Sequence, residues 1–384
     1  MIYLDNSATT FPKPVEVYDF MNDFYRTHGV NPGRSGFDAA VETGEMVSHT
    51  RQMLTQLFNG GSDFNRLTFS YNATDSLNIL IQGLAEKGMH VISTMLEHNS
   101  VLRPLYHLEQ QGIIEVTYLP FDAQGYLNPD DIKSAVRSNT RMMICTQCSN
   151  VLGTVQPIAA IGKICKENGL IFVVDGSQGA GINEMNMIEF GVDAYAFTGH
   201  KCLMGPTGIG GSYVREGVEV HHTRFGGTGV RSAQKNHLEE YPYRLEAGTL
   251  NLLGVAGLYA GVKWITAQDI KQLHAQEMHL WQRLRDGLKN IDGVMLYCAD
   301  SAENRNSVLS LNINGFDPAD VSTMLDVDYD IACRAGFQCA PKVHECIGTI
   351  PLHGTVRLSI GPFNTEPDID TAIEAVGDIA KMRN

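Results

Sequence analysis

The first half of the chain alternates between two spacings of apolar residues. Short apolar runs predict strands at residues 66–73, 90–95, 114–120, 141–149, 170–176 and 192–199. Between them, apolar residues three or four positions apart predict helices at residues 74–85, 101–112, 127–136 and 157–169. Strands that alternate with helices form a parallel sheet covered by helices on both faces. The pattern therefore predicts an α/β fold with a mostly parallel sheet.

The remaining segments follow other patterns. A short strand and turn open the sequence, and residues 215–249 are rich in loop-forming residues. Helices are expected at residues 15–25, 39–58 and 252–264, the last continuing into a helical stretch at residues 266–289. After residue 292, short strands and helices follow one another in an order typical of an antiparallel α+β unit.

These patterns predict two domains. The large domain covers residues 15–264 and contains the alternating strands and helices. The small α+β domain combines residues 1–14 with residues 265–384. Ligands of a parallel sheet collect at the carboxyl ends of its strands, so we expect a site at that edge of the large domain.

Composition and charge narrow the class of protein. The 384 residues are 43% hydrophobic and 19% charged, as in an ordinary soluble globular protein. Acidic residues outnumber basic residues by 43 to 29, which gives a formal charge of −14 and argues against a nucleic-acid partner. The sequence opens without a targeting pattern and has no apolar stretch of membrane-spanning length. We therefore expect a cytoplasmic protein without a membrane partner.

The cysteines do not predict a disulfide scaffold. Eight of them, scattered over a chain of this length, are too few for one, so reduced thiols are expected. Cys145 and Cys148 form a C-x-x-C pair, but no second pair follows at the spacing of a zinc finger. We expect this pair to be structural and expect no metal site.

One lysine stands in an unusual setting. Lys201 lies between His200 and Cys202, ahead of a turn rich in glycine, and has no carboxylate within several positions. A desolvated amine loses its proton more readily, and a neutral amine can form a Schiff base with a carbonyl group. On these residues alone, the alternative is a loop lysine whose ammonium group reaches solvent.

Two strand ends carry candidate ligand-binding side chains. Asp175 ends an apolar strand, where a carboxylate could hold a pyridinium proton or could instead form a turn or helix cap. His98 follows another strand, where its imidazole could stack on a ligand ring or hydrogen-bond within the loop. At a third strand end, Ala73 and Thr74 open a helix whose N-terminus favours a phosphate, although Thr74 could be an ordinary cap.

A candidate nucleophile lies far along the chain. Cys339 occurs in the segment RAGFQCAP, whose glycine and proline predict a mobile loop with an accessible thiol. On these residues alone, Cys339 could also be a merely exposed cysteine, and Cys346 is the rival nucleophile or a resolving partner. Arg334 and Arg357 could clamp a carboxylate, against the alternative of arginines in surface ion pairs.

Taken in order along the chain, these segments resemble one family. The matching motifs are YLDNSATT, the Thr74 turn, the EH pair at 97–98, SNVLGT, VVDGSQ, TGHKCLMGPTGIG, EAGTLN and RAGFQCAP. Their order and spacing resemble the NifS/SufS-like cysteine desulfurases of the class V aminotransferase fold. The resemblance implies pyridoxal 5'-phosphate as cofactor and a fold type I architecture, with a seven-stranded-type sheet and a smaller C-terminal α+β domain.

The resemblance also implies roles for individual residues. Lys201 would carry the cofactor through a Schiff base, Asp175 would pair with its pyridine nitrogen, and His98 would stack on its ring. Gln178 would bind the phenolic oxygen. The implied phosphate ligands are Ala73, Thr74, Thr198 and His200, with Thr249 from the other subunit of a homodimer. The implied ligands of the substrate carboxylate are Asn150, Arg357 and, as a second arginine, Arg334.

The implied reaction converts L-cysteine to L-alanine. Cys339 would take the sulfur as a persulfide and pass it to an acceptor protein or thiol, as in sulfur mobilisation for iron–sulfur cluster assembly. Selenocysteine lyase, a class V aminotransferase and a non-catalytic relative are the alternatives. The cysteine segment has Ala335, Phe337 and Gln338 where the SufS-like motif has threonine and histidine residues, so the subgroup stays open.

Overall fold

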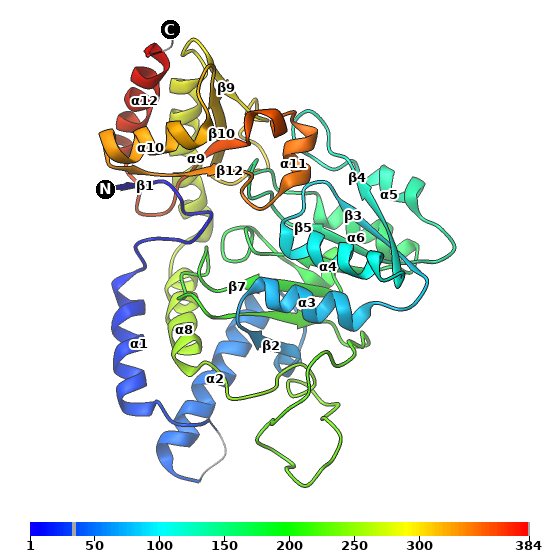
Figure 1. Cartoon of the computed structure of the whole chain (residues 1–384). Helices are drawn as coiled ribbons and strands as arrows, with labels where there is room; N and C mark the ends of the chain where they lie inside the picture. Colours follow the sequence, from blue (N-terminus) through cyan, green and yellow to red (C-terminus); the bar gives the residue numbers. More distant parts are fainter. Residues whose placement is uncertain (33–35, 383–384) are drawn as a thin grey trace.

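A seven-stranded sheet forms the centre of the molecule (Figure 1). The structure is a computed structural model that describes residues 1–32 and 36–382. The strand order is β2-β8-β7-β6-β5-β3-β4, and β8 runs in the opposite direction to the other six strands. The strands are β2 (Leu67–Ser70), β3 (Met89–Thr94), β4 (Ile114–Leu119), β5 (Thr140–Thr146), β6 (Ile171–Asp175), β7 (Ala194–Thr198) and β8 (Gly210–Val214). The prediction of a mostly parallel sheet is confirmed.

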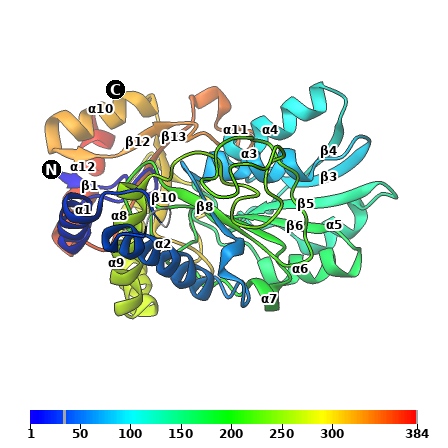
Figure 2. The same cartoon turned by 90° about the horizontal axis from the view of Figure 1, so that it is seen from below.

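Helices cover both faces of this sheet (Figure 2). The side chain of Val173 packs on the face that carries α3 and α4, whereas its neighbours Phe172 and Val174 belong to the core on the opposite face. This alternation follows from the two-residue period of a strand, and burial on both faces explains why the strands are apolar throughout. The helices of these layers are α3 (Ala73–Leu84), α4 (Asn99–Gln110), α5 (Pro129–Ala135), α6 (Ile158–Glu167) and α7 (Met187–Phe190).

A second sheet contains strands from the C-terminal part of the chain. Its order is β12-β13-β10-β9, and all its pairs are antiparallel, so the predicted α+β unit is confirmed. Its strands are β9 (Val294–Leu296), β10 (Val308–Ile313), β12 (Arg334–Gly336) and β13 (Thr355–Ser359). Its helices are α9 (Ile270–Leu288), α10 (Pro318–Tyr329), α11 (Pro341–Cys346) and α12 (Glu366–Lys381). A separate hydrophobic core forms here around the buried Trp281.

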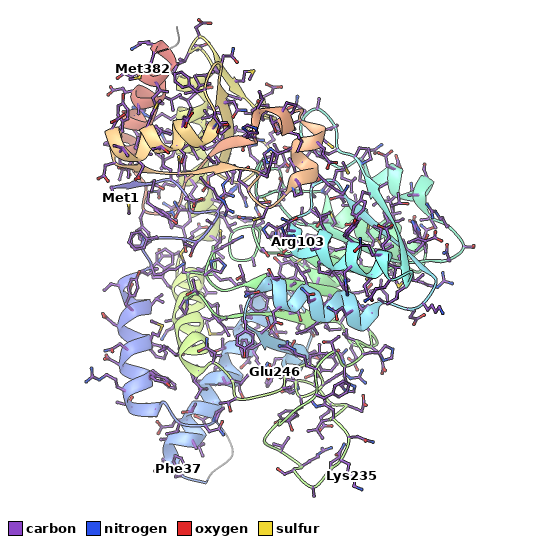
Figure 3. All side chains as sticks on the ribbon, in the orientation of Figure 1. Met1, Phe37, Arg103, Lys235, Glu246 and Met382 are labelled. Carbon is purple, nitrogen blue, oxygen red and sulfur yellow. The ribbon has the colours of Figure 1, made fainter. Side chains whose placement is uncertain are left out.

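The N-terminus joins this C-terminal unit. Strand β1 (Ile2–Tyr3) pairs in parallel with β11 (Ile331–Ala332), and Leu4 is buried in the second core. Met1 and Met382 therefore lie in the same part of the molecule, at the top of Figure 3. The domain boundary between residues 264 and 265 stays a prediction.

Helices α1 (Val15–His28), α2 (Asp38–Leu57) and α8 (Leu252–Ala267) pack together beside the central sheet (Figure 1). The predicted continuation of α8 into the next helix was wrong. The Asp269 side chain accepts hydrogen bonds from the backbone N–H groups of Lys271 and Gln272, and it thereby caps a new helix, α9.

The loop between β8 and α8 projects from the body, with Lys235 near its tip (Figure 3). It returns at Glu246, which is buried against the sheet. Glu246 accepts hydrogen bonds from the Phe69 backbone N–H (2.6 Å) and from Arg51 Nη2 (2.8 Å). The buried Arg51–Glu246 ion pair and the bond from Phe69 fix the position of the chain where the loop ends against the sheet. Within the described ranges, no helix is long and apolar enough to cross a bilayer.

The second core contains a titratable group, Glu277 on α9. Its side chain is buried and accepts a hydrogen bond from Ser307 Oγ (2.8 Å). Burial raises the pKa of Glu277 from 4.5 to about 8. Since the folded state holds this proton more tightly than the unfolded state, the stabilisation is complete below about pH 4.5 and is lost as the pH rises toward 8.

We therefore expect Glu277→Gln to weaken the pH dependence of stability, because glutamine keeps the bond from Ser307 and carries no charge. Between about pH 5 and 8, the wild type should lose on the order of 3 kcal/mol more unfolding free energy than the variant. Urea unfolding followed by tryptophan fluorescence measures this difference, since Trp281 lies in the same core. Glu374→Gln, at an exposed position on α12, is the control. If the unfolding free energies of the wild type and Glu277→Gln changed equally with pH, the prediction would be contradicted.

Candidate active site

A cavity of about 280 Å³ lies at the carboxyl ends of β3, β5, β6 and β7. Arg334 and Arg357, on the second sheet, complete its wall. The predicted site residues that line it are Ala73, Thr74, His98, Asn150, Asp175, Gln178, Thr198, His200, Lys201, Arg334 and Arg357. Residues that sequence reasoning missed include Ser7, Asn72, Ser100, Thr146 and Ser177.

Lys201 sits in a tight turn directly after β7. The Gly205 N–H donates to the Gly199 carbonyl (2.8 Å), which closes the turn around the lysine. Helix α8 supports the turn at Gly261, where a Cβ atom would lie only 2.4 Å from the Leu203 carbonyl oxygen. Burial lowers the pKa of Lys201 to about 8, although the nearby Asp175 opposes this shift. The amine therefore becomes neutral, and nucleophilic, near physiological pH.

Asp175 ends β6 with its carboxylate almost completely buried. Its Oδ1 accepts hydrogen bonds from the Ser177 backbone N–H (2.9 Å) and from Ser177 Oγ (2.5 Å). These bonds form a turn, which the sequence suggested as the alternative role of Asp175. Because both bonds go to Oδ1, the second oxygen, Oδ2, can still bind a ligand. Burial raises the pKa of Asp175, while the Ser177 bonds and the Lys201 charge lower it. The position of Ser177, two residues after a strand-end aspartate, is the signal that could have identified it.

His98 caps helix α4 and is held in one tautomer. Its Nδ1 accepts a hydrogen bond from the Ser100 backbone N–H (3.0 Å), so the ring proton of the neutral imidazole lies on Nε2. Burial and the charge of Lys201 lower the pKa of His98 to about 3. Ser100 Oγ lies 2.7 Å from His98 Nδ1 and 2.8 Å from Thr74 Oγ1. This chain of polar atoms joins His98 to the first turn of α3.

The first turn of α3 forms an anion site with two neighbouring side chains. Asn72 caps this helix by accepting a hydrogen bond from the Asp75 N–H (3.0 Å), and the helix N-terminus favours negative charge. Among the described residues, Thr198 Oγ1 and His200 Nδ1 are buried without a hydrogen-bond partner. Buried polar atoms without partners are rare, so this end of the cavity fits a phosphate group.

Arg357 also lines the cavity. Its Nη2 pairs with Asp5 Oδ1 (2.5 Å) and its Nη1 donates to the Asn150 carbonyl (3.0 Å). Its Nε is buried and has no partner within the described part of the chain. The Asn150 amide donates to the Gln338 carbonyl (2.7 Å), which orients Asn150 toward the cysteine segment. Sequence reasoning missed Asp5, although it lies in the YLDNSATT motif.

The loop predicted around Cys339 is confined to a short turn at residues 337–340, and its mobility stays a prediction. Arg334–Gly336 is strand β12, because these residues pair with β13, and α11 begins at Pro341. Between them, Gln338 and Cys339 have φ values of 40° and 59°, in the left-handed region that residues with a side chain rarely adopt. Cys339 does not line the cavity, but its Sγ lies 3.4 Å from Nη2 of Arg334, which does.

Two further predicted residues lie outside the cavity. Thr249 is exposed in a surface groove beside Asp75, so its role in a second subunit's site stays a prediction. Cys346 is exposed at the end of α11. Cys145 and Cys148 are buried. In residues 1–32 and 36–382, no group of three histidine, cysteine or acidic side chains could hold a metal ion.

The fold and the cavity define a class of enzyme. A lysine with a lowered pKa, a buried aspartate and a neutral histidine meet beside a phosphate site at the carboxyl edge of a mostly parallel sheet, as in pyridoxal 5'-phosphate enzymes of fold type I. The chain belongs to the aminotransferase class-V family, whose model matches residues 2–371. The cofactor of this family is pyridoxal 5'-phosphate, and the residues of the cavity fit it.

Known relatives bear out the predicted resemblance to cysteine desulfurases. Cysteine desulfurase CsdA of Escherichia coli is 32% identical, over 98% of this chain and 93% of that protein. Cysteine desulfurase IscS of Methanosarcina thermophila is 30% identical, over 100% of this chain and 93% of that protein. The apo structure of a cysteine desulfurase from Thermococcus onnurineus superposes with a TM-score of 0.91 at 31% identity, covering 99% of this chain and 94% of that one.

Proposed function

We propose that this chain is a cysteine desulfurase that converts L-cysteine to L-alanine and takes the sulfur onto Cys339. The observation that carries the proposal is the position of Arg334. This arginine lines the cavity that contains Lys201, and its Nη2 lies 3.4 Å from Cys339 Sγ. The proposed sulfur acceptor therefore contacts a residue that lines the cavity of the lysine. The lysine supports pyridoxal chemistry, and the neighbouring thiol supports sulfur transfer.

The residues of the large domain would hold the cofactor. Lys201 would bind it covalently, Asp175 would pair with its pyridine nitrogen and His98 would lie against its ring. Gln178 binds the phenolic oxygen. The phosphate ligands are Ala73, Thr74, Thr198 and His200. The bound cofactor supplies an electron sink for a bond that breaks at the α carbon of the substrate.

The other residues act on the substrate itself. Arg357, Asn150 and Arg334 orient its carboxylate, and the Lys201 amine moves the proton at the α carbon. The Cys339 thiolate attacks the substrate sulfur, so that a sulfur–sulfur bond forms as the bond between sulfur and the β carbon breaks. The carbon fragment takes up a proton and leaves as L-alanine. Cys339 is left as a persulfide, which a thiol or an acceptor protein then removes.

The proposal includes the wider setting of the enzyme. Two copies of the chain form a homodimer in which Thr249 of each reaches the phosphate site of the other. Thr249 is exposed and does not line the cavity of its own chain, which leaves its hydroxyl accessible to a second copy. We also propose a cytoplasmic location, where thiol acceptors stay reduced, and a supply of sulfur for iron–sulfur cluster assembly.

Product stoichiometry tests the proposed reaction. Purified protein loaded with pyridoxal 5'-phosphate should release sulfide and L-alanine in equal amounts from L-cysteine and dithiothreitol. With one equivalent of L-cysteine per chain and no dithiothreitol, L-alanine should form while the sulfur stays on the chain, because Cys339 then remains a persulfide. Pyruvate formed by amino-group transfer without sulfide would instead identify an aminotransferase, and turnover of selenocysteine but not cysteine would identify a selenocysteine lyase.

A further inference from the structure

A buried chain of hydrogen bonds leads away from the residue before Cys339. Gln338 Oε1 lies 3.0 Å from His344 Nε2, and His344 Nδ1 lies 2.7 Å from Thr349 Oγ1. All three side chains are buried, with exposed fractions of 2% for Gln338 and 0% for His344 and Thr349. None of the proposed catalytic steps uses His344 or Thr349.

The direction of each bond in this chain follows from its neighbours. Gln338 Nε2 donates to the Thr355 carbonyl (2.7 Å), so the other amide atom, Oε1, is the acceptor. His344 must then donate through Nε2 and accept through Nδ1, and the Thr349 hydroxyl is the donor that Nδ1 requires. Burial lowers the pKa of His344 to about 4, which keeps the imidazole in the neutral form that this pattern needs.

Residues of the large domain also bind the backbone carbonyl groups of Gln338 and Cys339. The Gln338 carbonyl accepts a hydrogen bond from Asn150 Nδ2, and the Cys339 carbonyl accepts one from the Asn99 N–H, both at 2.7 Å. These bonds act on two consecutive residues in the left-handed region of φ, a conformation that persists only where its surroundings impose it. The Gln338 side chain provides the anchor on the opposite side, in the small sheet.

We propose that Thr349 and His344 are positioning residues, which hold Gln338 in its buried site and thereby fix the Cys339 thiol beside Arg334. This inference rests on the proposed desulfuration for its effect on turnover. The side chain of His344 lies between those of Thr349 and Gln338. Thr349 itself does not line the cavity or bond to Cys339. Its hydroxyl donates to His344 Nδ1 and so stabilises the tautomer in which Nε2 donates to Gln338.

Thr349→Val tests this proposal in the holoenzyme, since valine fills the same space without the hydroxyl. We expect kcat for sulfide release to fall by about 10- to 100-fold, because a small displacement of a reacting group has that effect, while KM for L-cysteine stays unchanged. Thr349→Ser, which keeps the hydroxyl, should stay within about threefold of the wild type. Thr323→Val removes a hydroxyl from α10 that bonds only locally, and it should leave kcat unchanged.

A second measurement does not depend on desulfuration. Iodoacetamide alkylation of Cys339, followed by peptide mass spectrometry, reports the access and setting of its thiol, with Cys346 of the same molecule as internal reference. The Cys339/Cys346 rate ratio should change by at least about threefold in Thr349→Val and return to the wild-type ratio in Thr349→Ser. If this pattern holds in a protein that releases no sulfide, the positioning role stands and the proposed function fails.

A second pair of variants keeps the test decisive if Thr349→Val does not fold. His344→Gln retains an N–H donor near the position of Nε2, and His344→Leu retains none. We expect His344→Leu to show the loss of kcat and the changed alkylation ratio, and His344→Gln to recover most of both. A wild-type kcat and alkylation ratio in Thr349→Val or His344→Leu would overturn the proposal. So would a loss of kcat in Thr349→Ser and His344→Gln as large as in Thr349→Val and His344→Leu.

Discussion

Replacing Cys339 with alanine is expected to lower sulfide release from L-cysteine by about 1,000-fold or more, because the variant has no thiolate to take the substrate sulfur. The cofactor should still bind normally, since Cys339 does not line the cavity and its thiol lies against Arg334 at the cavity wall. Sulfide assays and the visible absorbance of the bound cofactor measure the two effects separately. A loss of both together would point to a folding defect instead.

Cys346→Ala is the matched control for this variant. Cys346 is exposed and lies at the far end of α11, so its removal should leave sulfide release within about twofold of the wild type. Mass spectrometry after one turnover without reductant should find one extra sulfur atom on the peptide that contains Cys339. Full turnover by Cys339→Ala, or the extra sulfur on Cys346, would show that the nucleophile was assigned wrongly.

Most of the fold could be predicted because its signals are local. The central strands are apolar on both faces and are separated by amphipathic helices, so their order along the chain already indicates a parallel sheet. The break between α8 and α9 was missed because the helical spacing of apolar residues continues across it. Only the capping bonds made by Asp269 end one helix and start the next.

The site was predictable where residues lie at strand ends. Asp175, His98 and Lys201 each follow a strand, and the parallel sheet brings their strand ends to one edge. The setting of Cys339 could not be predicted in this way. Strand β12 is one of the short strands expected after residue 292, but the turn that follows it is held by Asn99 and Asn150, which lie far away in the sequence.

The polar residues that support the site were also hidden in the sequence. Ser100 and Ser177 are common residue types at helix starts and turns, so their bonds to His98 and Asp175 are visible only in three dimensions. Asp5 pairs with Arg357 across 352 positions of the chain. Such long-range pairs determine the orientation of charged groups, and no local pattern in the sequence indicates them.

Removal of Lys201 should have the second large effect. In Lys201→Ala, borohydride should no longer attach the cofactor to the chain, and sulfide release should fall by about 1,000-fold or more, because the variant lacks both the amine that binds the cofactor and the group that moves the α proton. Digestion and mass spectrometry of the reduced wild type should locate the cofactor on the peptide that contains Lys201. Lys235→Ala, at the exposed tip of the long loop, is the control and should behave as the wild type.

The pH dependence of cofactor capture gives this assignment a further test. Since burial lowers the pKa of Lys201 to about 8, its amine is mostly protonated below that pH and mostly neutral above it. The rate at which apo-protein forms the borohydride-reducible link should therefore rise as the pH passes through about 8 and then level off. An ordinary exposed lysine would show a continued rise toward about pH 10, because that is where a solvated amine loses its proton. A rate that rises only in that higher range, or a cofactor found on another lysine, would exclude Lys201 as the buried amine that binds the cofactor.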